Sequence, residues 1–94
     1  MSSTHFFYIL KCSDGSFYVG STTNLENRVK THNQGKGATY TSKRRPVQLI
    51  YHEQFKSFDD AVQRERQVKK WSGAKKEALI RGEMETLQKL SKSH

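Results

Sequence analysis

The sequence is poor in cysteine, proline and acidic residues, and it has no long hydrophobic run. Cys12 is the only cysteine, so neither an intramolecular disulfide nor a cysteine-based structural zinc site can form. No apolar stretch approaches the roughly 20 residues that a transmembrane helix needs. Residues 1–5 lack the charged-then-apolar pattern of a signal peptide. These absences favour a cytoplasmic protein without a membrane partner.

The shortage of acidic residues leaves a large positive charge on a short chain. The 94 residues, which fit one domain, include 17 Lys and Arg against 9 Asp and Glu, a formal net charge of +8. Such a field attracts polyanions, and nucleic acid is the usual partner. The competing interpretation is a protein-interaction domain whose charge serves solubility alone.

Two short apolar runs predict a β-hairpin. Residues 6–10 are apolar, aromatic and uncharged, which is typical of a strand buried on both faces. Residues 16–20 form the expected partner strand, and Ser13-Asp14-Gly15 between them is a strong turn signal. A three-residue loop suits Gly15 in the left-handed conformation.

The loop length decides where two tyrosines point. A three-residue loop pairs Tyr8 with Gly20 and Leu10 with Tyr18, so both phenols lie diagonally on one face. A two-residue loop would put them on opposite faces. We expect the longer loop, with Gly20 leaving room for a substrate backbone.

The rest of the chain predicts a second strand-and-helix pattern. A capping box with Thr23 as N-cap and Glu26 three residues on begins the first helix. That helix is expected to run to about residue 33, and a polar loop at 35–45 follows it. A strand is expected at 47–53. Two more helices follow, one from Ser57 or Phe58 to about 70 and one at 74–90, with a candidate break at Gly82.

Glu65 is an anomaly in the pattern of the second long helix. At 100° per residue it falls within the arc of the apolar positions Phe58, Ala61, Val62 and Val68. A carboxylate on an apolar stripe is costly unless it is paired or binds a metal. Two readings stay open: a metal ligand at the edge of the core, or an ion pair with a nearby arginine.

Arg28 and His32 are four residues apart and therefore share one side of the first helix. Arg28 is either a solvated side chain or a bidentate phosphate clamp over the sheet. His32 is a candidate proton acceptor or phosphate ligand, although a lone helix histidine is more often neither. Tyr8 and Tyr18 are either packing residues or phenols that relay a proton of an attacking water.

A basic loop surrounds another aromatic residue. Basic side chains beside an aromatic suit phosphate neutralisation and base stacking, which predicts a nucleic-acid-binding segment. A charged surface loop without a ligand is the alternative. The residues concerned are Lys36, Tyr40, Lys43, Arg44 and Arg45.

These residues, in this order, resemble the GIY-YIG nuclease family, and its small single-domain bacterial members most. Residues 6–8, Phe-Phe-Tyr, stand at the first tripeptide motif, and residues 18–20, Tyr-Val-Gly, match the second. Arg28, His32 and Glu65 follow in the family's order. The chain departs from the family at Phe6 and Phe7, which replace Gly and Ile, and its last asparagine is Asn33, so a late asparagine of some members has no counterpart.

The resemblance implies an α/β (α+β) fold in which a three-stranded antiparallel sheet is flanked by helices. The domain spans 6–82, between an N-terminal tail at 1–5 and a C-terminal helical extension and tail at 83–94. It also implies one Mg²⁺ or Mn²⁺ ion held by Glu65, water and phosphate. Arg28 then neutralises phosphate charge, and one tyrosine acts on the attacking water with help from His32.

The function implied is metal-dependent endonucleolytic cleavage, with DNA in repair or recombination as the expected substrate and a partner protein supplying targeting. The alternative within the same fold is a nucleic-acid-binding module with weak or absent catalysis. The missing late asparagine and the lack of a separate DNA-binding domain favour that alternative.

Overall fold

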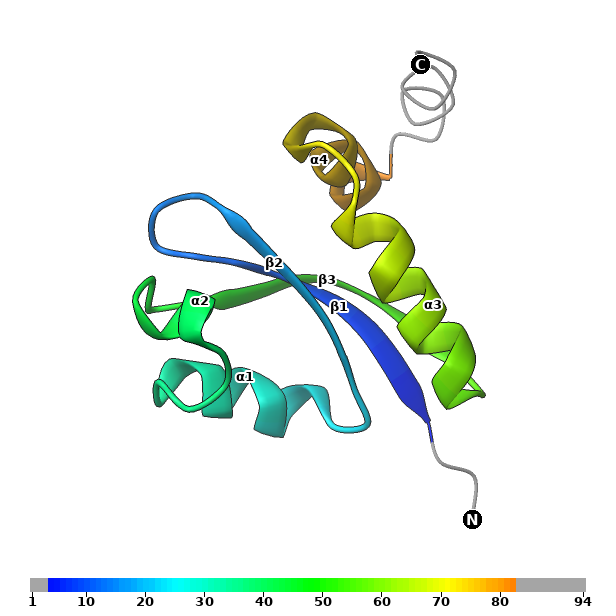
Figure 1. The fold of residues 1–94 in the computed structure, drawn as a ribbon, viewed down its shortest axis with the longest axis horizontal. Coiled ribbons are helices and arrows are strands. Elements are labelled where there is room, and N and C mark those ends of the chain that lie inside the picture. Colours follow the sequence, from blue (N-terminus) through cyan, green and yellow to red (C-terminus); the bar gives the residue numbers. More distant parts are fainter. Residues whose placement is uncertain (1–3, 83–94) are drawn as a thin grey trace.

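The protein is a three-stranded antiparallel sheet with helices on both sides, as expected (Figure 1). The computed structural model describes residues 4–82, so the extension expected at 83–94 lies outside the described residues. The elements in chain order are β1 (His5–Lys11), β2 (Phe17–Thr22), α1 (Leu25–Asn33), α2 (Thr39–Ser42), β3 (Gln48–Phe55), α3 (Phe58–Lys69) and α4 (Gly73–Arg81).

The hairpin has the predicted three-residue loop and the predicted register. Cys12 N–H donates to the Ser16 carbonyl at 2.8 Å, and Gly15 has a φ of 86°, the left-handed conformation that glycine adopts without strain. Tyr8 therefore pairs with Gly20, as expected. The sheet order β2-β1-β3 makes β1 the central strand and β2 an edge strand.

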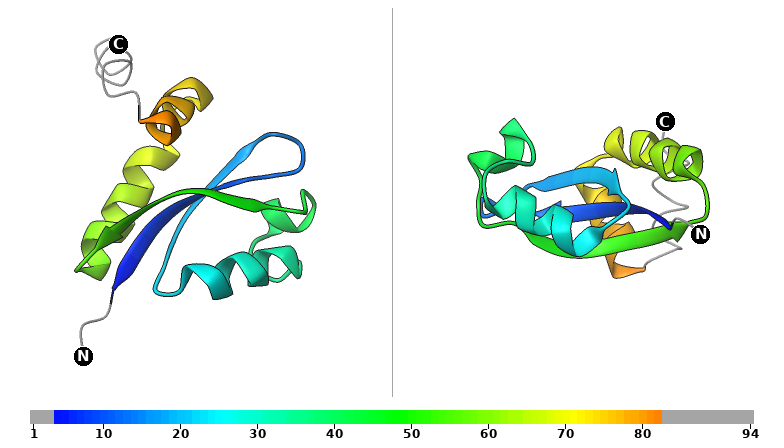
Figure 2. Two further views of the ribbon diagram at one scale, coloured as in Figure 1. Left: turned by 180° about the vertical axis from the view of Figure 1, so that it is seen from behind. Right: turned by 90° about the horizontal axis from the view of Figure 1, so that it is seen from below.

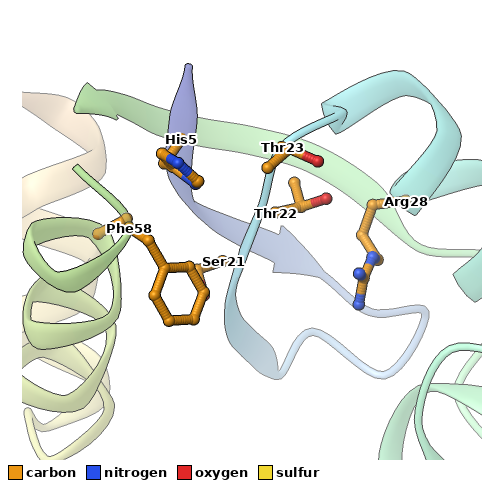
Figure 3. Close-up of a pocket in the computed structure, with 7 residues that line it drawn as sticks. His5, Ser21, Thr22, Thr23, Arg28 and Phe58 are labelled. Carbon is orange, nitrogen blue, oxygen red and sulfur yellow. The ribbon is translucent and has the colours of Figure 1, made fainter. Parts of the chain in front are cut away.

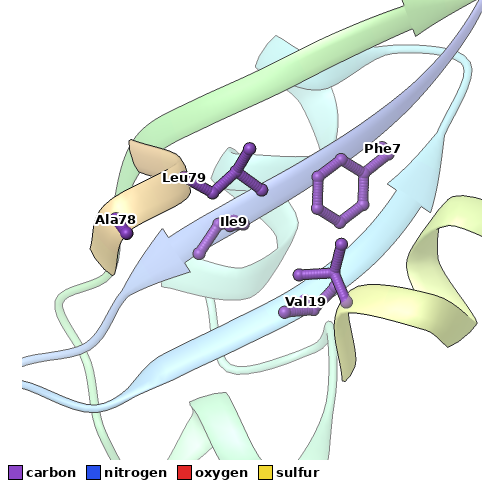
Figure 4. Close-up of a cluster of buried hydrophobic side chains, with 6 residues drawn as sticks. Phe7, Ile9, Val19, Ala78 and Leu79 are labelled. Atoms are coloured by element: carbon purple, nitrogen blue, oxygen red, sulfur yellow. The ribbon is translucent and has the colours of Figure 1, made fainter. Parts of the chain in front are cut away.

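Each face of the sheet carries its own core. On one face, Phe7, Ile9 and Val19 pack against Val68 of α3 and against α4 (Figure 4). On the other face, a second cluster of buried residues includes Tyr8, Leu10, Cys12 and Val47, and the apolar side of α1 packs against it. Figures 1 and 2 show α1 and α2 on one side of the sheet and α3 and α4 on the other.

A β-bulge explains three consecutive apolar residues in β3. Ile9 pairs with Tyr51 and Leu10 pairs with Leu49, which leaves Ile50 as an extra residue. Ile50 and Tyr51 consequently pack against the same core, while Leu49 packs against the other. The strand begins and ends later than the predicted 47–53, at Gln48–Phe55.

The first helix begins one residue later than predicted. Asn24, rather than Thr23, has the extended N-cap backbone and accepts a hydrogen bond from Asn27 N–H at 3.0 Å. An asparagine caps at least as well as a threonine, which makes two adjacent cap residues ambiguous in sequence. The helix α3 begins at Phe58, one of the two predicted starts, with Ser57 as its N-cap, and the left-handed Gly82 ends α4 at the predicted break.

Two other expectations were wrong. The polar segment at 35–45 is not entirely loop, because Thr39–Ser42 forms the short helix α2. Phe58 does not belong to the buried stripe of α3: its ring is 61% exposed, while Ala61 and Val68 are buried. Phe58 is the first residue of α3, where the helix projects past the core. Within residues 4–82, no helix has the length and apolar character required to cross a membrane.

Candidate active site

The predicted site residues gather around the edge strand β2 from both faces of the sheet. Tyr8 and Tyr18 belong to the face covered by α1, as their shared register predicted. Ser21 pairs with Phe7 on the face covered by α3, and there its hydroxyl reaches Glu65. The site therefore joins two layers of the fold across one strand.

Tyr8 and His32 are joined by a buried hydrogen bond. The Tyr8 hydroxyl lies 3.1 Å from His32 Nε2, and each side chain is 1% exposed. His32 Nδ1 lies 2.7 Å from Thr41 Oγ1, whose hydroxyl donates to the Ala38 carbonyl. The Thr41 hydroxyl has one proton for these two contacts: directed at Ala38, it makes Nδ1 the donor and leaves Nε2 to accept the Tyr8 proton, whereas directed at Nδ1, it leaves the ring proton on Nε2. His32 is a neutral base hydrogen-bonded to a phenol.

The electrostatic environment keeps both tyrosines and the histidine uncharged. Burial raises the pKa of Tyr8 well above 10.0, and Tyr18 and Glu65 add to the rise, while the charge and hydrogen bonding of Arg28 oppose it. Burial also raises the pKa of Tyr18, with Glu65 adding and Arg28 opposing. Burial, then Arg28, lowers the pKa of His32 below 6.5. Glu65 and Arg28 thus act on both phenols.

Tyr18 stands in a stack of aromatic rings. Its ring centroid lies 5.1 Å from that of His32 and 6.2 Å from that of Tyr40, to which it is nearly parallel at 28°. The guanidinium of Arg44 lies 3.9 Å from the centroid of the Tyr40 ring and also pairs with Asp14 at 3.1 Å. The Tyr40 ring is thus in contact with two side chains of its own chain, Tyr18 and Arg44.

Glu65 is held by a hydroxyl rather than by a cation. Its Oε1 accepts from Ser21 Oγ at 2.8 Å, and the ion pairs among residues 4–82 do not include it. The open alternative of an arginine partner is therefore not what the structure has. A half-buried carboxylate with one oxygen engaged suits one hydrated Mg²⁺ or Mn²⁺, since such ions need only one or two protein carboxylates.

The described residues offer no richer metal site. Residues 4–82 contain no group of three or more His, Cys, Asp or Glu side chains that could hold an ion. A metal at Glu65 would consequently depend on water and substrate phosphate for its other ligands.

Arg28 projects from α1 over a cleft beside the site. The cleft has a volume of about 180 Å³ and lies between the start of α3 and the ends of β1 and β2 (Figure 3). Arg28 forms no ion pair with a carboxylate of residues 4–82, so its charge is available to an anion. The other labelled lining residues are His5, Ser21, Thr22, Thr23 and Phe58.

The basic segment divides into free and engaged side chains. Lys36 and Lys43 are exposed. Arg44 pairs with Asp14, and Arg45 donates to the carbonyls of Ser42 and Asn33. Because Tyr40 of this segment stacks on Tyr18, the basic segment borders the site directly.

Four residues that support the site were missed in the sequence. Ser21 holds Glu65 and Thr41 holds His32. Asn33 ties the end of α1 to β3, because its side chain both donates to and accepts from the backbone of Val47. A Cβ at Gly37 would lie 2.3 Å from His32 Nδ1. Only the glycine pair around Lys36 gave a signal, since glycine allows close approach.

A comparison with known families identifies the fold. The family described as GIY-YIG catalytic domain matches residues 4–78. The chain belongs to the GIY-YIG family. It is 53% identical over 76 residues to a UPF0213 protein of Bacillus pumilus, a match that covers 81% of this chain and 78% of the relative.

Two solved structures are similar to this chain. The UPF0213 protein BH0048 from Bacillus halodurans is 45% identical, with a TM-score of 0.54 over 82% of each chain. The protein EF2693 from E. faecalis is 44% identical, with a TM-score of 0.59 over 84% of each chain. Membership places the chain in a nuclease family whose substrate class is nucleic acid.

Proposed function

We propose that this GIY-YIG domain is an endonuclease that hydrolyses phosphodiester bonds of DNA with the help of Mg²⁺ or Mn²⁺. The observation that carries the proposal is the buried hydrogen bond between Tyr8 and His32 beside the Tyr18 ring, with Arg28 and Glu65 near enough to shift the pKa of both phenols. Hydrolysis of a phosphodiester uses a cation, a metal-binding carboxylate and a proton acceptor, and this chain has these three groups beside the edge strand β2.

Tyr8 and His32 would remove the proton of the attacking water. In the tautomer with Nε2 unprotonated, Tyr8 donates to His32, so the Tyr8 oxygen can accept a water proton as its own proton passes to the imidazole. The phenol then never carries a full negative charge, which matters because burial disfavours the phenolate. The Tyr18 hydroxyl has no hydrogen-bond partner among residues 4–82, so it is free to orient the water or the phosphate.

Arg28 and Glu65 would act on the phosphate. The guanidinium of Arg28, which pairs with no carboxylate among residues 4–82, would bind the phosphate oxygens and stabilise the charge that develops on them. Glu65, oriented by Ser21, would hold the divalent ion. When bound there, the ion would polarise the phosphate and stabilise the leaving oxygen.

A cleavage assay tests the proposal. Branched, nicked and single-stranded DNA are incubated with Mg²⁺, with Mn²⁺ or with a chelator, using wild type, Glu65→Gln and Glu26→Gln. We expect metal-dependent cutting that Glu65→Gln lowers by about 10²-fold or more. Glu26 is exposed in the first turn of α1, so Glu26→Gln removes the same charge outside the site and should cut like wild type.

Two outcomes would contradict the proposal. Equal cleavage by wild type and Glu65→Gln would remove Glu65 from the mechanism. Salt-sensitive binding with no cleavage of any substrate would support the binding module instead, which the absence of any asparagine after Asn33 favours. Circular dichroism of each variant controls for loss of the fold.

A further inference from the structure

Phe58 is placed where an apolar side chain gains nothing from the core. It is 61% exposed, the largest exposure among the large hydrophobic residues of 4–82. The His5 ring meets it edge-on with centroids 5.7 Å apart, which holds the ring at the cleft while most of its surface remains in solvent. An aromatic surface presented in this way is available for stacking.

The opposite wall of the cleft is polar and cationic. Arg28 and the hydroxyl-bearing residues Thr22 and Thr23 line the cleft on the other side of β2 from Phe58 (Figure 3). An apolar ring on one side and a guanidinium with hydroxyls on the other suit a ligand that is aromatic at one end and anionic at the other. A nucleotide has this character.

The cleft is continuous with the candidate active site. Arg28 lines the cleft and acts electrostatically on Tyr8, Tyr18 and His32. Ser21 lines the cleft and donates to Glu65. A phosphate bound at Arg28 therefore brings the base of an adjoining nucleotide to the cleft mouth.

The size of the cleft limits what can enter. Its volume of about 180 Å³ is below the roughly 300 Å³ at which pockets for whole small ligands begin. It suits a single base rather than a base pair. A base inside a duplex has both faces covered by its neighbours, so it must leave the stack to reach an aromatic side chain.

We propose that this cleft binds one unpaired nucleobase next to the phosphate that is cut, with the base stacked on Phe58. The position relative to the cut phosphate rests on the proposed function, whereas the binding of an unpaired base does not. The base comes either from a single strand or from a nucleotide displaced from a duplex. Phe58 thereby selects nucleic acid that can present an unstacked base.

Binding without cleavage tests the proposal. Fluorescence anisotropy in a chelator measures affinity for a single strand of roughly ten nucleotides, for a duplex with one unpaired base, and for a fully paired duplex. The variants are Phe58→Ala, Phe58→Trp and the control His52→Ala. His52 is an exposed aromatic residue of β3 outside the cleft. Because Phe58 is exposed, its replacement removes no core contact.

We expect Phe58→Ala to weaken single-strand binding by about 5- to 150-fold, the range for loss of one stacked base. Phe58→Trp should restore it, and His52→Ala should bind like wild type. A loss of affinity confined to the single strand would identify a single strand as the source of the base. A loss shared with the duplex that has an unpaired base would show that a displaced nucleotide also binds. Unchanged affinity of Phe58→Ala for both substrates, or an equal loss on the fully paired duplex, would overturn the proposal.

The outcome is separable from that of the proposed function. Wild type that binds through Phe58 but never cuts with metal would refute the nuclease and leave the base site standing. If wild type cuts DNA with metal and Phe58→Ala binds unpaired bases as tightly as wild type, the base site is refuted and the nuclease stands.

Discussion

The Thr41 hydroxyl lies 2.7 Å from His32 Nδ1, and this contact couples the tautomer of the ring to the Tyr8 hydrogen bond at Nε2. Thr41 itself is 0% exposed and lies in α2, whereas His32 lies in α1. The short helix that the sequence did not reveal therefore contacts the ring whose tautomer decides the direction of the Tyr8 hydrogen bond.

Thr41→Val should release the His32 tautomer. The variant keeps the shape of the side chain but leaves the buried Nδ1–H without an acceptor, a cost of about 1–3 kcal/mol. The imidazole then gains by moving its proton to Nε2, which ends proton donation by Tyr8. Nitrogen NMR of the histidine ring in the free protein should show this change, and DNA cleavage should fall with it.

Thr41→Ser and Ser42→Ala are the matched controls. Serine keeps the hydroxyl and should retain the tautomer. Ser42 is the neighbouring residue and its hydroxyl bonds only to the Thr39 carbonyl, so its loss should leave His32 unchanged. An unaltered His32 tautomer in Thr41→Val would show that the hydroxyl does not set it.

His32 should make the fold less stable in mild acid. Its pKa is lowered in the folded protein, below the ordinary 6.5 that it regains on unfolding. As the pH falls through 6.5, the unfolded chain takes up a proton that the folded one refuses, so the unfolding free energy decreases. The decrease ends once the folded imidazole is also protonated.

Denaturant unfolding measured from neutral to mildly acidic pH checks this sign. His32→Gln should show a flatter dependence than wild type, although its absolute stability is lower. NMR titration should place the His32 pKa below those of exposed model histidines. A wild-type stability that rises as the pH falls through 6.5 would contradict the assignment.

Gly37→Ala should disturb the histidine directly. A Cβ there would lie 2.3 Å from His32 Nδ1, and the buried ring has no room to retreat. Overpacking of this kind costs about 1–3 kcal/mol. Gly73→Ala is the control, because nothing lies within 4 Å of a Cβ at that position. Thermal unfolding should separate the two, and equal stability of both variants would count against close packing at His32.

Tyr40→Ala should loosen Tyr18. The stacked pair contributes roughly 0.5–1.5 kcal/mol beyond the burial of its area, and Arg44 loses its ring contact at the same time. Tyr40→Phe keeps the ring and should behave like wild type. The measurement is thermal stability together with the Tyr18 ring signals in NMR. Signals that stay unchanged in Tyr40→Ala would show that the stack does not position Tyr18.

Lys36 and Lys43 should set the salt dependence of DNA binding. Both are exposed beside the site, so each contact with a phosphate releases counterions. Replacing one of them with glutamine should lower the slope of log affinity against log salt by about 0.7–0.9. A wild-type affinity that barely changes with salt would favour the solubility interpretation of the charge.

The hairpin could be predicted because its local rules agree. The Ser13-Asp14-Gly15 turn favours a three-residue loop, and that loop length sets the strand register that puts both tyrosines on one face. Turns, helix caps and apolar periodicity depend on residues that are close together in the sequence, so they can be recognised from a single sequence. The helix cap was ambiguous only because Thr23 and Asn24 are both good caps.

The supporting contacts could not be predicted because they join distant segments. Ser21 and Glu65 are separated by 44 positions, and no pattern in either segment announces the other. The exposure of Phe58 follows from where α3 begins relative to the sheet, which periodicity does not contain. Glu65 was recognisable as an anomaly, whereas the identity of its partner depended on the tertiary fold.

The candidate site draws its residues from two layers that pack on opposite faces of one sheet. The tyrosine and histidine are anchored in the layer of α1 and α2, whereas Glu65 belongs to the layer of α3, and each layer has its own core. A substitution that removes the chemical role of the site residues in one layer can therefore leave the packing and the site residues of the other layer intact. Such a protein would still bind a nucleic acid strand after losing the ability to cleave it, so a single substitution could convert an enzyme of this fold into a binding protein.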